Sequence, residues 1–323
     1  MAIKRNTLRQ ISLKNQIETI LLLILMGGFS WLLGAWLFGD SFAYIALMAG
    51  VMVLALNPAV STNMLMRAYR ASPLNYHRAP ELNQIAQIIS QRAKLNHTPE
   101  LYYVPVSTMN AFATGTQAKA AIGLSHGLLQ QLTLEEVAGV LAHEISHIRH
   151  NDMRVMAIAD TLGNLTRTLS LLGQFILLVS IPMILSGVAE INLLPLALLI
   201  AAPTISAIIQ LAISRRREYQ ADLSSAELLG SPQPLIKALR RLDQQNSYWE
   251  RFYRASSDNG LLRTHPKTED RIEQLNAVYQ AANLEPEQAG YFAGYDPLNF
   301  PKTKQSPWSH SLRPRRFSRY FWF

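Results

Sequence analysis

The sequence predicts a mainly α-helical membrane protein, with four transmembrane helices and a small cytosolic α+β domain that carries a short β-sheet. Three observations lead to this prediction: long uncharged apolar runs, polar stretches of ordinary composition between them, and basic residues gathered beside the apolar runs. Of the 323 residues, 49% are hydrophobic and only 16% are charged. This balance disfavours an ordinary soluble protein.

The first two membrane spans are predicted near the start of the chain. Residues 17–38 are almost wholly apolar and are interrupted by Glu18 near their start. About 22 residues make a helix of about 33 Å, enough to cross the hydrocarbon core. A second apolar run, 42–56, ends before Asn57 and Pro58. A cleaved signal peptide is the alternative for the first run, which is long for that role and leads directly into the second.

Two further spans are predicted within residues 168–213, where Glu190 is the only charged residue. The run divides at residues 190–192 into two segments of about 22 residues each, which matches the thickness of the hydrocarbon core. Its prolines argue against a soluble helix but are tolerated in membrane helices. The alternatives are a buried soluble hairpin, or a hairpin that enters the membrane only partly and shelters a cleft.

The basic residues set the predicted orientation. The N-terminal tail and the flanks of the other spans are basic, whereas the connections at 39–41 and 190–192 contain acids and no lysine or arginine. The positive flanks then fall on one side, which the positive-inside rule assigns to the cytosol together with both termini. The same placement accounts for the net charge of +8 without nucleic acid, for which we find no motif.

The predicted organisation has six parts. These are a basic cytosolic tail (1–15), a first transmembrane hairpin (16–58), a first soluble part (59–167), a second transmembrane hairpin (168–213), a second soluble part (214–295) and a C-terminal tail (296–323). The C-terminal tail is rich in arginine and aromatic residues, which would suit either lipid headgroups or a disordered segment.

The two soluble parts are predicted to form helices and short strands. Residues 101–106 and 111–124 are predicted to be strands, with turns at Gly115 and Gly123. Elsewhere apolar residues recur at helical spacing. The helices predicted in this way cover residues 82–89, 134–150, 235–244 and 269–282.

The helix at 134–150 contains the most informative motif of the chain, His143-Glu144-Ile145-Ser146-His147. Thr133 and Glu136 form a capping box at its start, and an apolar stripe runs along it, which is typical of a well-defined amphipathic helix. Two imidazoles four residues apart lie on one helical face and can bind the same zinc ion. Glu144 then lies beside a metal-bound water.

A catalytic zinc site usually takes three protein ligands. The chain has no cysteine, so the third ligand must be a histidine or a carboxylate. Glu218 and Asp222 lie on one helical face shortly after the last apolar run. Glu218 could bind the metal while Asp222 accepts the ring N–H of a ligand histidine. Taken alone, the two acids would also suit a solvated pair beside Arg215 to Arg217.

One further segment contains polar groups of catalytic type, His265-Pro266 followed by Arg271. A cation or N–H donor there could stabilise the oxyanion of a tetrahedral intermediate. The segment also fits a plain helix start with proline in the first turn. Structural, surface or core roles are expected for the other histidines, which are His77, His97, His126, His150 and His310.

Together these segments resemble the HtpX-type membrane zinc metallopeptidases, which are related to the CAAX prenyl proteases and to the mitochondrial stress protease of the inner membrane. The resemblance covers roughly residues 15–280 and leaves the C-terminal tail unexplained. It rests on four motifs in the family's order: Asn110-Ala-Phe-Ala-Thr-Gly115, Ala142-His-Glu-Ile-Ser-His147 with Asn151 and Asp152, Arg217-Glu-Tyr-Gln-Ala-Asp222, and His265-Pro266 with Arg271.

The resemblance implies a gluzincin-like catalytic domain and a zinc metalloendopeptidase. One Zn²⁺ per subunit would be held by His143, His147 and Glu218, with Glu144 as general base. Its substrates would be membrane proteins or unfolded polypeptides, cleaved at the cytosolic face of a bacterial inner membrane during quality control under stress. No nucleic-acid partner is expected, and the sequence does not predict an oligomeric state.

The resemblance also implies substrate contacts. His265 and Arg271 would touch the substrate or the transition state, and Asn110 would lie on an edge strand that binds an extended peptide. Two other classes compete with this reading. One is a membrane binding or scaffold protein stapled by zinc, which would not need Glu144. The other is a transporter, which the scarcity of charge within the spans disfavours.

Overall fold

The computed structural model describes residues 2–39, 62–188, 193–252 and 268–281 of the chain. Its internal contacts divide the protein into two units. Unit 1 comprises Met1–Pro58, Arg154–Glu218 and Ser257–His265, and unit 2 comprises Ala59–Met153, Tyr219–Ser256 and Pro266–Phe323.

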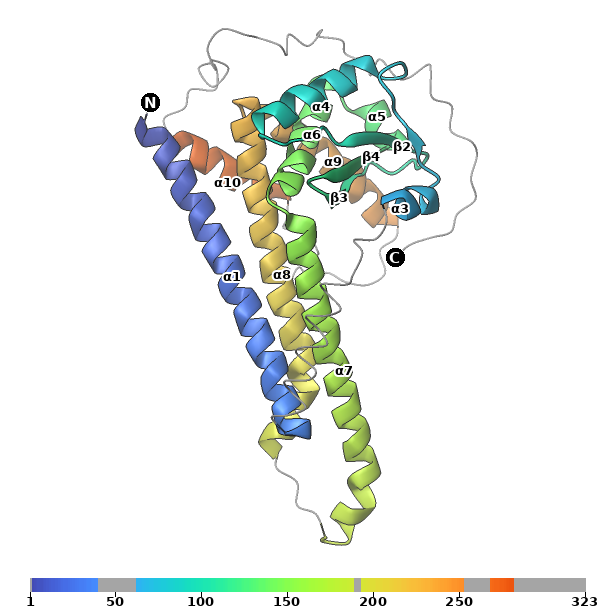
Figure 1. Cartoon of the computed structure of the whole chain (residues 1–323), viewed down its shortest axis with the longest axis vertical. Helices are drawn as coiled ribbons and strands as arrows, with labels where there is room; N and C mark the ends of the chain where they lie inside the picture. Colours follow the sequence, from blue (N-terminus) through green and yellow to red (C-terminus); the bar gives the residue numbers. More distant parts are fainter. Residues whose placement is uncertain (1, 40–61, 189–192, 253–267, 282–323) are drawn as a thin grey trace. The chain divides into compact units, whose positions relative to one another are not determined.

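Unit 1 is built from three long helices, α1 (Ala2–Phe38), α7 (Asp152–Leu185) and α8 (Leu193–Leu229), which run side by side (Figure 1). The first residues of α7 and the last turns of α8 belong to unit 2. All three helices are long and apolar enough to cross a membrane. The predicted second span, 42–56, lies outside the described residues, so the number of four spans stays a prediction.

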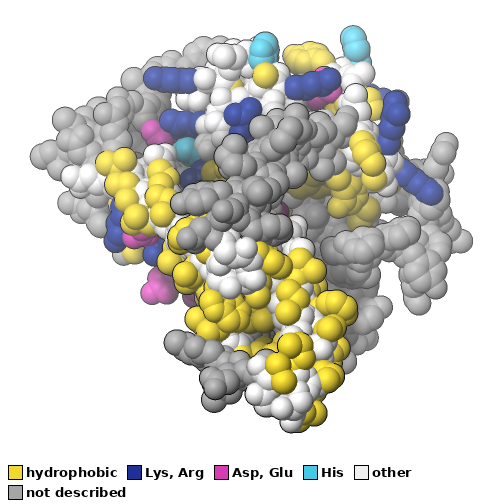
Figure 2. All heavy atoms as spheres, turned by 60° about the horizontal axis from the view of Figure 1, so that its bottom comes forward, with side chains coloured by type: hydrophobic (Ala, Val, Ile, Leu, Met, Phe, Trp, Pro, Cys, Tyr) yellow, Lys and Arg dark blue, Asp and Glu magenta, His cyan; other side chains and the backbone are white. Residues whose placement is uncertain are grey.

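Small contact surfaces hold the three helices together. Met26, Ala159 and Ile209 form one buried cluster, and the hydroxyls of Ser30 and Thr166 are 2.7 Å apart. Many of the large apolar side chains of these helices are exposed instead, among them Ile24 and Leu25 of α1. Figure 2 shows the hydrophobic surface over the ends of the helices that lie at the bottom of Figure 1. Such a surface is typical of helices that contact lipid.

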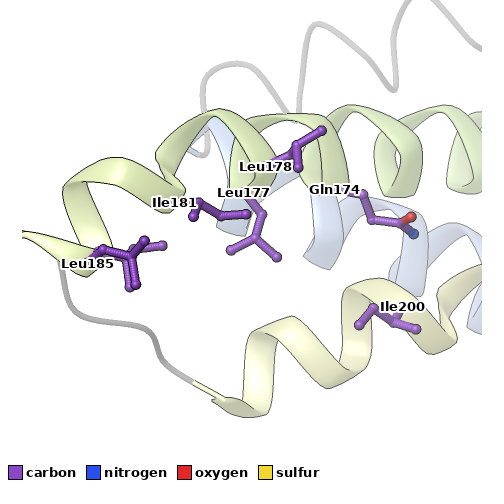
Figure 3. Close-up of a pocket in the computed structure, with 7 residues that line it drawn as sticks. Gln174, Leu177, Leu178, Ile181, Leu185 and Ile200 are labelled. Carbon is purple, nitrogen blue, oxygen red and sulfur yellow. The ribbon is translucent and has the colours of Figure 1, made fainter.

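Helices α7 and α8 also border an open apolar groove of about 480 Å³. Figure 3 shows its lining, in which Gln174 is the polar side chain among aliphatic ones. The Gln174 amide donates to Ser170 Oγ at 3.0 Å, and Ser170 donates in turn to the Leu199 carbonyl at 2.7 Å. This part of α7 is therefore apolar, and its polar groups bond within the helix pair.

Unit 2 contains a four-stranded sheet in the order β1-β2-β4-β3. Strands β2 and β4 are parallel, and the other two pairs are antiparallel. Strand β3 lies at one edge of this sheet, next to β4. The strands are β1 (Ser72–Pro73), β2 (Glu100–Val104), β3 (Ala111–Thr116) and β4 (Lys119–Ser125).

Helix α6 (Leu134–Arg149) runs through the core of unit 2 and packs against α4, α9 and strand β3. Its predicted stripe is buried, including Leu141, Ile145 and Ile148, none of which is exposed. The other helices of unit 2 are α3 (Thr62–Ala68), α4 (Pro80–Arg92), α5 (His126–Gln131), α9 (Gln233–Phe252) and α10 (Thr268–Ala281). The prediction of a mainly helical protein with a small sheet is thus confirmed.

The predicted turn at Gly123 was wrong. Gly123 pairs with Tyr102 and Phe112 inside the sheet, and a Cβ there would lie 2.7 Å from the Phe112 ring. The glycine is needed for close packing of that ring rather than for a turn. The turn lies instead between β3 and β4, after Gly115, whose φ of +94° favours glycine.

Candidate metal centre

The start of α6 fixes the position of the HExxH motif. Thr133 Oγ1 accepts the Glu136 N–H at 3.3 Å, and Glu136 Oε2 accepts the Thr133 N–H at 2.8 Å, which is the predicted capping box. Since the cap sets where the helix begins and the buried stripe sets its rotation, the imidazoles of His143 and His147 extend from one face.

Both imidazoles are held by carboxylates. The Nδ1 atom of His143 is 3.0 Å from Asp222 Oδ1, and the Nδ1 atom of His147 is 2.7 Å from Asp152 Oδ2. An ionised carboxylate can only accept, so each ring carries its proton on Nδ1 and presents a lone pair at Nε2. The two rings are thereby set in the tautomer that a metal ligand requires.

The two Nε2 atoms point at each other at a distance of 3.1 Å. Two lone pairs at this distance repel unless a cation lies between them. Zinc–nitrogen bonds of 2.0–2.1 Å in a tetrahedral site place two ligand nitrogens about 3.3 Å apart. The donor set therefore fits a zinc ion.

The third predicted ligand lies with this pair. His143, His147 and Glu218 each offer one ligand atom, and these three atoms lie within 4.8 Å of one another. Glu218 is buried and stands one helical turn before Asp222 on α8. Adjacent turns of α8 therefore supply both carboxylates: Glu218 lies beside the two histidines, and Asp222 orients His143.

Arg271 of α10 lies on Asp222. Its Nε donates to Asp222 Oδ2 at 2.8 Å, its Nη2 donates to Oδ1 at 2.5 Å, and only 8% of the residue is exposed. Burial by itself would raise the pKa of Asp222, but the Arg271 guanidinium outweighs it and holds the pKa of this carboxyl below its ordinary value. Arg271 therefore keeps the partner of His143 ionised, a contact that the motif alone did not reveal.

The other predicted site residues have different positions. Glu144 is buried on α6, between the two histidines in sequence. Asn110 is exposed and directly precedes β3, and its backbone N–H and carbonyl bond to Ser125 at the end of β4. His265 lies outside the described residues, so its contact with substrate stays a prediction.

Asp152 was quoted among the family motifs but received no role from the sequence. Asn151, whose φ is +55°, separates α6 from α7 and turns the chain, so that Asp152 at the start of α7 meets His147. The sequence did contain a signal: Asp152 follows the ligand His147 by five residues and lies at the start of a helix, where a carboxylate is favoured. This spacing becomes informative only once the break between the helices is known.

Two imidazoles from an HExxH helix and one carboxylate from a second helix form a group that could hold a metal ion. This set of ligands, with a further carboxylate behind each imidazole, is typical of metallopeptidases. The comparisons with known proteins agree with this class. Residues 76–279 match the family model of Peptidase family M48, and the chain belongs to this family of metallopeptidases.

Several relatives match almost over their whole length. A "Protease HtpX homolog" of Trichormus variabilis is 34% identical over 291 residues, which cover 81% of this chain and 96% of the relative. Proteins of the same name from Acaryochloris marina and Streptococcus pyogenes are 35% and 33% identical and cover 84% and 83% of this chain, and 97% and 98% of their own lengths. The resemblance predicted from the motifs is therefore confirmed.

Among solved structures, the crystal structure of S. mikatae Ste24p aligns with a TM-score of 0.47 at 22% identity. The alignment covers 82% of this chain and 66% of that one. The metallopeptidase assignment rests on the sequence relatives and on the metal centre.

Proposed function

We propose that this protein is a membrane-bound zinc endopeptidase that cleaves membrane proteins or unfolded polypeptides at the cytosolic face of a bacterial inner membrane, in quality control under stress. The observation that carries the chemical part is the pair of Nε2 lone pairs of His143 and His147, 3.1 Å apart and each fixed by a carboxylate on the opposite ring nitrogen. This arrangement serves a bound cation.

A bound zinc ion and Glu144 would have different roles in peptide hydrolysis. A bound zinc ion would supply Lewis acidity and lower the pKa of a coordinated water towards 7. Glu144 accepts the proton of the attacking water and delivers it to the leaving amine. Because the Glu144 side chain is buried, its carboxylate acts in a site with little competing water, where electrostatic effects are stronger.

The edge strand β3 offers a binding site for the substrate backbone. Among the described residues it pairs with β4 on one side only, and it packs against α6, which carries the HExxH motif. An extended peptide added to this edge would bond through its backbone, independent of its sequence. Such a mode suits an enzyme that acts on unfolded chains, and Asn110 stands at the start of the strand.

Helix α8 supports a placement of the metal centre near the membrane. This helix continues without interruption from its apolar part into the turn that contains Glu218. From Ile213 to Glu218 the rise is about 7.5 Å, so the metal ligand follows closely on the last apolar residues. Substrates would therefore be polypeptide segments close to the bilayer. The cytosolic side is proposed from the basic flanks alone.

The test of this proposal is Glu144→Gln, with zinc content and cleavage of β-casein measured on the same purified sample. We expect unchanged zinc content and a loss of cleavage by about 10²- to 10⁴-fold, since a general base is lost while the metal ligands remain. The matched control is Glu135→Gln on the same helix, which removes only a surface ion pair with Lys237.

Cleavage by Glu144→Gln at the wild-type rate would rule out this mechanism. Full zinc content without cleavage in the wild type as well as in the variant would favour the competing class, a zinc-stapled scaffold whose metal has no catalytic role. A Glu135→Gln variant as inactive as Glu144→Gln would show that the assay reports damage to the helix rather than loss of the base.

A further inference from the structure

Helix α3 of unit 2 and the turn after it expose apolar and basic side chains together. Met64 is 70% exposed and Tyr69 is 47% exposed, and Arg67 and Arg70 are exposed as well. Met66, which is 3% exposed, anchors the segment in unit 2. We call Met64, Arg67, Tyr69 and Arg70 the α3 surface. Cations beside apolar and aromatic side chains are typical of segments that lie at a membrane surface.

The charges around the α3 surface have one sign. Residues 41–80 contain no aspartate or glutamate, and neither do residues 111–125 of the β3–β4 hairpin beside α3. Lys119, at the start of β4, is exposed. The surface is therefore complementary to anions, and acidic lipid headgroups are anions that lie next to an apolar phase. The C-terminal tail does not complement it, because residues 297–323 contain lysines and arginines but no acid.

Contacts within unit 2 place α3 near the point where the chain enters an apolar helix. A Cβ at Gly115, in the β3–β4 turn, would lie 2.9 Å from the hydroxyl of Thr62 at the start of α3. In the same turn, Gln117 donates to the Arg149 carbonyl at 2.7 Å, at the end of α6. Helix α7, a candidate membrane span, begins at Asp152. The β3–β4 turn therefore contacts both the start of α3 and the residues just before α7.

The sequence before α3 also brings it close to a membrane span. The predicted second span, 42–56, lies outside the described residues and ends six positions before Thr62. Six residues reach at most about 21 Å when fully extended, so α3 begins within this distance of the end of that apolar run. Helix α3 thus follows one predicted span closely and shares a contacting turn with the start of another.

We propose that the α3 surface binds the anionic lipid headgroups of the bilayer that contains α1, α7 and α8. The cations meet the acidic groups of the lipids, while Met64 and Tyr69 enter the boundary between headgroups and acyl chains. The inference rests on the membrane placement in the proposed function. It adds a membrane contact that unit 2 makes with its own surface.

This contact bears on the edge strand that would bind substrate. The ring of Tyr69 lies 5.0 Å from the ring of Phe112 in β3, measured between centroids. A bilayer contact at Tyr69 therefore also holds β3 close to the membrane surface. Polypeptide segments that leave the bilayer would meet this edge first.

The absence of cysteine from the chain allows a test with the full-length protein in lipid nanodiscs. Met64→Cys is labelled with a bimane fluorophore. The matched control is Gln87→Cys, an exposed position of α4, which lies at the top of unit 2 in Figure 1, away from α3. Lipids with a nitroxide at the headgroup should quench the label at position 64 severalfold more than the label at position 87. Equal quenching at the two positions would overturn the proposal.

Arg70 and Lys94 form a matched pair for a test of the charge. Each follows the end of a helix, α3 or α4, with a positive φ of +50° or +58°, a conformation that favours glycine. Arg70→Gly and Lys94→Gly therefore each remove a cation without straining the backbone. At an ionic strength that half-releases the label at position 64, Arg70→Gly should lower the ratio of lipid-contacting to free protein about fivefold. Lys94→Gly should leave it unchanged.

Two other results would contradict the binding of anionic lipid. One is a ratio that Arg70→Gly does not change, or equal quenching in nanodiscs of neutral lipid. The other is a label at position 64 that is shielded from an aqueous quencher in detergent and is not quenched by lipid, which would reveal a protein partner such as the chain's own tail. The measurements need no catalysis, so their failure is distinct from failure of the peptidase mechanism.

Discussion

Polar side chains occur in two contrasting settings in this protein. Around His143 and His147 they are buried and bonded in series, from Arg271 through Asp222 to one imidazole and from Asp152 to the other. Along α7 they are exposed on a helix whose neighbours at the same depth are apolar. The first setting fixes side chains before a ligand arrives, whereas no described residue fixes the side chains of Asp160, Asn164 and Arg167 in the second. Buried polar groups that are bonded in this way indicate a preorganised site, and the exposed polar side chains of α7 lack this feature among the described residues.

The largest expected effect comes from removing the carboxylate that joins the two histidines. Glu218→Gln should lower the zinc affinity by more than the 10- to 100-fold that loss of an outer hydrogen-bond partner typically causes, because the amide is a weaker ligand than the carboxylate. Competition with a chromophoric chelator measures this. Glu227→Gln, an exposed position on the same helix, should keep wild-type affinity. Full zinc affinity in Glu218→Gln would remove this residue from the metal centre.

The next effect concerns the carboxylates behind the imidazoles. Asp222→Asn and Asp152→Asn should each weaken zinc binding about 10- to 100-fold, since each frees a ring to rotate or to change tautomer. Asp270→Asn, an exposed acid of α10, serves as the control. If either variant bound zinc as tightly as the wild type, the series of buried contacts would not be what prepares the metal ligands.

Arg271 could act by holding Asp222 or by touching the transition state, and two measurements distinguish these roles. If it acts through Asp222, Arg271→Lys should weaken zinc binding as well as catalysis, because a lysine cannot reproduce the two-pronged contact. If it touches only the transition state, kcat should fall while zinc affinity stays unchanged. Arg271→Met leaves a buried carboxylate without its cation and should destabilise the fold by about 3–5 kcal/mol, as measured by denaturant unfolding.

The smallest expected effect lies outside both settings, at a buried pair in unit 2. His126 is 4% exposed, its Nδ1 lies 2.9 Å from Tyr103 Oη, and burial lowers the pKa of this histidine below 6.5. As pH falls below 6.5, the unfolded chain takes up a proton that the folded protein does not, so stability should decrease towards pH 5 by at most about 1.4 kcal/mol per pH unit. His126→Gln should flatten this slope in pH-dependent thermal unfolding, and an unchanged slope would contradict the assignment.

Much of the fold could be predicted because its signals are local. The HExxH helix was expected at 134–150 and spans Leu134–Arg149, since Thr133, Glu136 and the apolar stripe all act within a few turns. The apolar runs gave the long helices by length and composition alone. The turn predicted at Gly123 was wrong because this glycine makes room for Phe112 on another strand. A local sequence pattern does not reveal such a contact.

The sequence by itself determined which helices form, which of them are apolar enough for a membrane, and which residues have the chemistry of zinc ligands. Only the tertiary structure decided that Arg271 bonds to Asp222, that Asp152 meets His147, and that the polar residues of α7 lie beside apolar parts of α1 and α8. The physical reason is that periodicity fixes the face of a helix on which a side chain lies, whereas its partner depends on which distant element packs there.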